Sequence, residues 1–78
     1  MKFNKYEWFK NQDKEVGVKQ LYQAGILPMS IYVYWKIYND YLRLSKENIK
    51  KKEVIKHLSI IHGKSKRLIY YAIKYFEQ

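Results

Sequence analysis

The feature that most constrains this fold is how side chains are sorted over residues 66–76. At about 100° per residue, the apolar side chains gather on one arc of a helix. They are Leu68, Ile69, Ala72, Ile73, Tyr75 and Phe76. The opposite arc carries Lys66, Arg67, Tyr70, Tyr71 and Lys74, with no carboxylate. The pattern predicts an amphipathic helix that packs one face on a core and presents the other to solvent.

Four further helices are predicted between the glycines and the single proline, at residues 5–14, 16–24, 31–44 and 51–62. Gly25 suits a left-handed helix end, and Pro28 stops that helix from continuing. Ser30 suits the N-cap of the helix that follows. The sequence therefore predicts the all-α class, as a small bundle of about five helices that ends in a helix-turn-helix.

The predicted helix over residues 31–44 is the most apolar of the five. Its apolar side chains cover an arc of roughly 200°, which is typical of a central helix covered on two sides. Only Tyr32, Lys36, Asn39, Asp40 and Arg43 are expected to face outward. In the next helix, the inner face is expected to hold Val54, Ile55, Leu58 and Ile61. We expect a single domain over 1–78, with a three-helix core at 30–78 and an N-terminal helical extension at 1–28.

The net charge of +9 is unevenly distributed along the 78 residues. Residues 1–40 hold six lysines and four acidic residues, whereas residues 41–78 hold ten Lys and Arg and three acidic residues. A C-terminal half with a charge of +7 suggests a polyanionic partner. The alternative is a solvated, lysine-rich surface that reflects AT-rich coding.

Several classes of function lack a signature in this sequence. There is no cysteine, and His57 and His62 lack a third ligand at a useful spacing, so we expect no metal. Neither a nucleophile triad, a glycine-rich phosphate loop nor a carboxylate pair is present, and we expect neither an enzyme nor a cofactor. No apolar stretch reaches the roughly 18 residues that a membrane span needs. No apolar signal region follows the basic start, so we expect a cytoplasmic protein with no membrane partner.

Residues 53–76 resemble the helix-turn-helix family of bacterial and phage DNA-binding proteins. Ser59 occupies the small-residue position where the two helices cross, and Gly63 lies in the turn. Ser65 opens the second helix, and Ile69 matches the apolar residue that joins this helix to the first. Lys64 departs from the pattern, because the family usually has an apolar residue there.

The resemblance implies a sequence-specific protein for double-stranded DNA, with a recognition helix at about residues 66–76. Lys66 and Arg67 would reach base edges, and Ser65 would cap the helix or donate to a phosphate. The remaining expected contacts to DNA come from Lys64, Tyr70, Tyr71, Lys74, Lys50, Lys51 and Lys52. We expect a transcriptional or replication regulator of a phage, a plasmid or a low-GC bacterium.

Other readings of the same sequence stay open. Residues 18–44 also read as helix, turn and helix, which makes them a rival DNA-reading unit. A protein-binding module is the main alternative function, for example a small phage-type inhibitor of a host nucleic-acid enzyme, since aromatic residues anchor such interfaces. Exposed aromatic residues beside the basic surface would favour DNA, and exposed aromatic residues on the N-terminal side would favour a protein partner.

Trp8 suggests a homodimer. On a helix, Phe3, Tyr6 and Phe9 lie on one side, because each step of three residues turns only about 60° from the last. Trp8 lies roughly 100° from that stripe. We therefore expect the stripe to pack on the domain and Trp8 to contact the same helix of a second subunit.

Overall fold

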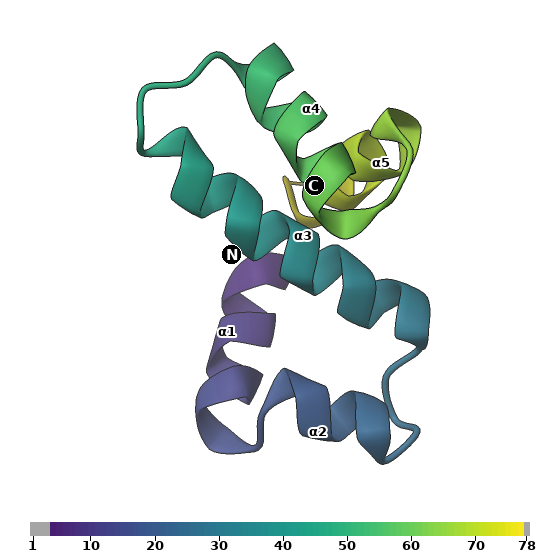
Figure 1. The fold of residues 1–78 in the computed structure, drawn as a ribbon. Coiled ribbons are helices and arrows are strands. Elements are labelled where there is room, and N and C mark those ends of the chain that lie inside the picture. Colours follow the sequence, from purple (N-terminus) through teal and green to yellow (C-terminus); the bar gives the residue numbers. More distant parts are fainter. Residues whose placement is uncertain (1–3, 78) are drawn as a thin grey trace.

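The computed structural model describes residues 4–77, and every regular element in this range is a helix. The five helices are α1 (Lys5–Glu15), α2 (Val18–Gln23), α3 (Met29–Ser45), α4 (Lys51–His62) and α5 (Lys66–Glu77). Helix α3 runs through the middle of the molecule, with α4 and α5 on one side and α1 and α2 on the other (Figure 1). The predicted all-α class and the five helices are confirmed.

The start of α3 differs from the prediction. Pro28, rather than Ser30, occupies the N-cap position, and Ser30 lies within the first turn. The Pro28 carbonyl accepts a hydrogen bond from the Tyr32 amide at 3.1 Å. Proline has no backbone N–H, and a helix needs none at its N-cap. The helix can therefore begin directly after Pro28, whose φ is −61°. Gly25 has φ of +77° just after α2, as predicted for a left-handed helix end.

Helix α3 is the central helix that the wide apolar arc predicted. It packs against α2, α4 and α5, and Trp35, Ile37 and Tyr38 are buried. Among the side chains expected to face outward, Lys36 and Arg43 are exposed. Tyr32 instead stacks on Tyr22 of α2, with ring centroids 4.8 Å apart. This prediction was wrong for Tyr32 because α2 covers that side of α3.

Asn39, also expected to face outward, is bound within the fold. Its side-chain amide donates to the Trp35 carbonyl at 3.0 Å, and its oxygen accepts from the Tyr6 hydroxyl at 3.3 Å. The second bond joins α3 to α1, whose approach could not be read from the pattern of α3 alone. Asn39 therefore helps to hold the N-terminal helix in place.

A cluster of aromatic rings joins α1, α3 and α5. Phe76 lies at its centre, and its ring centroid is 5.2 Å from that of Phe9, 5.8 Å from that of Trp35 and 5.3 Å from that of Tyr38. Tyr6 borders the same cluster, so the predicted packing of Tyr6 and Phe9 on the domain is confirmed. Phe3 lies outside the described residues. Helices α1 and α2 therefore share the main core through Phe9 and Val18.

The aromatic cluster also changes the acidity of one of its members. Burial raises the pKa of the Tyr38 phenol above its ordinary value, and the nearby Glu77 carboxylate adds to the increase. The phenols of Tyr41 and Tyr6 act in the same direction. Tyr38 therefore stays neutral within the core at physiological pH.

Helix α4 has the predicted bounds but not the whole predicted inner face. Val54, Ile55 and Leu58 are buried, whereas Ile61 is 51% exposed. In the last turn of α4 it is His62 that points at α3, because it bonds to Asp40 there. Ile61 lies about 100° away from His62 on the helix and is left at the edge of the contact. None of the helices in residues 4–77 has the length and apolar character needed to cross a membrane.

Candidate nucleic-acid interface

The turn between α4 and α5 is closed by Gly63 and Ser59. Gly63 has φ of +62° and ψ of 34°, the left-handed conformation that glycine adopts without steric cost. The Lys64 amide donates to the Ser59 carbonyl at 3.1 Å, and the Ser59 hydroxyl donates to the Lys64 carbonyl. These bonds close the turn through the backbone of residue 64, whose side chain is exposed. A lysine is therefore accommodated at a position where an apolar seal was expected.

Ser65 caps the start of α5, as predicted. Its hydroxyl oxygen accepts a hydrogen bond from the Leu68 amide at 3.2 Å, and its carbonyl accepts from the Ile69 amide at 3.1 Å. The cap uses the Ser65 oxygen only as an acceptor. The hydroxyl proton thus remains free to be donated outward.

The two predicted faces of α5 are confirmed. Ile69, Ala72, Ile73 and Phe76 are buried in the core, and Leu68 and Tyr75 are half-buried against it. The outer face of α5 consists of exposed side chains, namely Lys66, Arg67, Tyr70, Tyr71 and Lys74. Tyr70 and Tyr71 are 48% and 50% exposed. The helix thus presents three cations and two phenols to solvent, while its opposite face is packed against the core.

Two residues of the outer face contact each other. The Nε–H of Arg67 donates to the hydroxyl of Tyr71 at 2.9 Å, and the guanidinium carbon lies 5.6 Å from the centroid of the Tyr71 ring. The pair is four residues apart, which is the spacing that brings side chains together on a helix. Sequence reasoning did not anticipate the pair, although the spacing alone could have indicated it.

A shallow groove of about 330 Å³ places Lys51, at the start of α4, beside the outer face of α5. Its lining residues are Lys51, Tyr70, Ile73, Lys74 and Glu77. Of the three consecutive lysines expected to contact DNA, only Lys51 lines this groove. Lys50, the N-cap of α4, and Lys52, in its first turn, are exposed outside the groove. Glu77 lies in the last turn of α5, one residue beyond the predicted end. It brings a carboxylate to this end of the groove.

A polar network ties α4 to α3 close to the turn. Asp40 lies 2.9 Å from the Nε2 atom of His62 through one carboxylate oxygen and 3.2 Å from Arg43 through the other. Asp40 was expected to face outward, and this was wrong because the last turn of α4 covers it. His62 lies on the inner face of α4 near the turn. Within residues 4–77, no group of three or more His, Cys, Asp or Glu side chains is placed to hold a metal ion.

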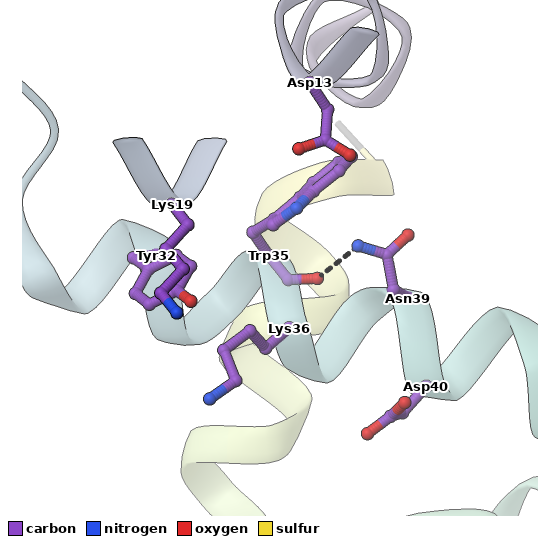
Figure 2. A pocket seen from close by; sticks show the side chains of 7 residues that line it. All are labelled: Asp13, Lys19, Tyr32, Trp35, Lys36, Asn39 and Asp40. Carbon is purple, nitrogen blue, oxygen red and sulfur yellow. Dashed lines mark hydrogen bonds between the residues drawn. The ribbon is translucent and has the colours of Figure 1, made fainter. Parts of the chain in front are cut away.

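A second pocket of about 330 Å³ lies on the N-terminal side, between α1, α2 and α3 (Figure 2). Its lining residues are Asp13, Lys19, Tyr32, Trp35, Lys36, Asn39 and Asp40. Three of these side chains form hydrogen bonds that hold the fold together. Asp13 accepts from the Val18 amide at 3.0 Å, and Asn39 and Asp40 have the partners described above. With two lysines and two carboxylates, the pocket has no preference for an anion.

The exposed aromatic side chains of residues 4–77 fall in two places. Tyr70 and Tyr71 lie on the basic face of α5, and Trp8 lies on α1 with 43% of its surface exposed. The Trp8 ring touches only that of Phe9 among the aromatic contacts of the described chain, with centroids 5.2 Å apart. Trp8 is thus placed off the packed stripe, as predicted.

Comparisons of the chain with protein-family models, with curated proteins and with solved structures found no match. The geometry and charge of the site are therefore the basis of its proposed function.

Proposed function

We propose that this protein is a small, sequence-specific double-stranded DNA-binding protein of the helix-turn-helix type. The observation that carries this proposal is the outer face of α5, where three cations and two phenols are exposed on a helix whose other face is buried. A tight glycine turn and a second helix precede it, which is the arrangement that places a recognition helix in the major groove. Its role would be that of a transcriptional or replication regulator of a phage, a plasmid or a low-GC bacterium.

In this proposal, the contacts divide between bases and phosphates. Lys66 and Arg67 are exposed in the first turn of α5, where side chains reach base edges. Ser65 can donate its hydroxyl proton to a phosphate while it caps the helix. The other phosphate contacts come from Lys64 and Lys74 on the α5 side and from the lysines that begin α4, Lys50, Lys51 and Lys52.

The surroundings of α3 argue against the rival reading of residues 18–44. Helix α3 is packed by α2, α4 and α5. Of its two outward cations, Arg43 is paired with the Asp40 carboxylate and Lys36 lies over the Tyr32 ring. The exposed aromatic residues also favour DNA over a protein partner. Two of the three exposed aromatic side chains in residues 4–77 lie on the basic face of α5. Trp8, on the N-terminal side, is the observation that favours a protein contact.

Replacing Arg67 by alanine tests the proposal and the choice of helix together. On a duplex selected by the wild-type protein from a random library, we expect Arg67→Ala to cost about 1–3 kcal/mol of binding free energy. The melting temperature should stay nearly unchanged, because Arg67 is exposed. Arg43→Ala is the matched control, since Arg43 is the exposed arginine of the rival helix. A larger loss for Arg43→Ala than for Arg67→Ala would make residues 18–44 the reading unit.

We further propose that the protein acts as a homodimer through Trp8. A single module buries only about 600–1,000 Å² on DNA, so a symmetric pair on two half-sites would supply useful affinity. We expect Trp8→Ala to lower the dimer fraction in sedimentation while the helical circular dichroism is retained. Binding to a two-half-site duplex should weaken more than binding to one half-site. Ile60→Ala removes another exposed apolar side chain and should change neither the dimer fraction nor the binding to either duplex. A monomeric wild-type protein at high concentration would contradict the proposal.

A further inference from the structure

The contact between Arg67 and Tyr71 has a chemical consequence for the donors of the guanidinium. Arginine carries five N–H donors, one on Nε and four on the two Nη atoms. The bond to the Tyr71 hydroxyl occupies the Nε–H, which leaves the two Nη groups at the end of the side chain. The two Nη groups lie in one plane and can donate parallel hydrogen bonds to two neighbouring acceptors.

Guanine is the base whose major-groove edge fits such a fork. It presents the N7 and O6 acceptors side by side, whereas adenine presents N7 beside an amino donor. With Nε–H already bonded, Arg67 has its Nη groups left for an end-on approach to both guanine atoms. The contact with the Tyr71 ring restricts the same side chain further, and a side chain that is ordered before binding loses less conformational freedom on binding.

We propose that Tyr71 is a positioning residue, which holds Arg67 for end-on reading of a guanine in the major groove. This inference rests on the proposed function, and it adds that the preferred duplex contains a guanine contacted by Arg67. Tyr71 acts through its hydroxyl, which accepts the Nε–H bond and need not touch the base.

Tyr70 provides a matched control next to Tyr71. The two phenols have nearly the same exposure, but Tyr70 lines the groove with Lys51 and Lys74, whereas Tyr71 bonds to Arg67. Tyr70→Phe and Tyr71→Phe each remove one hydroxyl and keep the ring. We expect Tyr70→Phe to affect only contacts to phosphate. We expect Tyr71→Phe to weaken the preference for guanine.

The first readout uses the free protein. In nuclear magnetic resonance spectra, the Nε–H signal of Arg67, assigned with an Arg67→Lys variant, should exchange slowly with water in the wild-type protein and in Tyr70→Phe. It should exchange rapidly in Tyr71→Phe. Equal exchange in all three proteins would overturn the inference whatever the DNA result, because the bond would not order the side chain.

The second readout uses DNA. Each guanine of the selected duplex is replaced in turn by 7-deazaguanine, which lacks the N7 acceptor. At the contacted guanine, the wild-type protein should lose about tenfold in affinity, the scale of one charge-assisted hydrogen bond. Tyr70→Phe should keep that ratio, and Tyr71→Phe should reduce it to about threefold or less.

The two levels of the proposal fail in different ways. If the wild-type protein binds no duplex at low salt, the proposed function falls and this inference with it. If it binds DNA but Tyr71→Phe keeps the full 7-deazaguanine ratio, only the positioning role of Tyr71 falls. If no guanine position responds to the replacement, Arg67 does not read guanine and the inference is likewise overturned.

Discussion

Ile69→Asp is expected to unfold the protein. The Ile69 side chain is fully buried between α5 and the rest of the core, and the described residues include no buried polar or charged side chain that could pair with a new carboxylate there. A domain of this size has a free energy of unfolding of only about 4–12 kcal/mol. Burying an unpaired carboxylate and losing the isoleucine packing together cost several kcal/mol, which is comparable with that total. Circular dichroism at 222 nm should show loss of helix at 25 °C.

Tyr70→Asp is the matched control for this substitution. It places the same carboxylate one residue further along α5, on the exposed face. There it lies four residues from Lys66 and from Lys74, a spacing at which opposite charges attract. We expect the free energy of unfolding to change by less than about 1 kcal/mol. If Tyr70→Asp unfolds the protein and Ile69→Asp does not, the two faces of α5 have been assigned the wrong way round.

Binding to duplex DNA is expected to weaken steeply with salt. If Lys and Arg side chains neutralise roughly six phosphates, the slope of log K against log salt should lie near −5. The affinity should then fall by about 10³-fold between 50 and 200 mM salt. The measurement is a mobility-shift or fluorescence titration on a mixed-sequence duplex at several salt concentrations. A flat response, or no binding at micromolar protein in low salt, would remove the case for DNA.

The groove between α4 and α5 allows the salt effect to be assigned to a surface. Replacing Lys51 and Lys74 together by glutamine should reduce the magnitude of the slope by nearly two, because each lost phosphate contact lowers it by about 0.9. Lys19→Gln removes an exposed cation on the N-terminal side and should leave the slope unchanged. If Lys19→Gln reduced the slope as much per lysine, cations on all sides of the molecule would contribute to DNA binding, and the groove would not be the binding surface.

The elements that could be predicted from the sequence are those governed by local patterns. Helix α5 has apolar residues at helical spacing, so its buried and exposed faces follow from about 100° of rotation per residue. Gly63 and Ser65 shape only the backbone next to them. Gly63 lies in the turn and Ser65 caps α5, as predicted. The bounds of α4 were predicted for the same reason, since its inner face and the glycine after it are local signals.

The features that could not be predicted depend on which helix lies opposite a residue. Asp40 was expected to face outward, but α4 covers it and supplies His62. Ile61 was expected to be buried, but the direction in which α4 crosses α3 turns the half-buried His62 toward Asp40 instead and leaves Ile61 exposed. The groove that joins Lys51 to Lys74 likewise depends on how the start of α4 lies against α5.

The sequence by itself therefore determined the helices, the turn and the two faces of α5, and with them the composition of the basic surface. Only the tertiary structure decided which residues bond across helices, namely Asp40 with His62 and Asn39 with Tyr6. It also decided that Lys51 lines the same groove as Tyr70 and Lys74. The physical reason is that helical periodicity sets the direction of each side chain relative to its own axis. The crossing of two helices depends on the packing of both surfaces at once, and no single segment encodes that information.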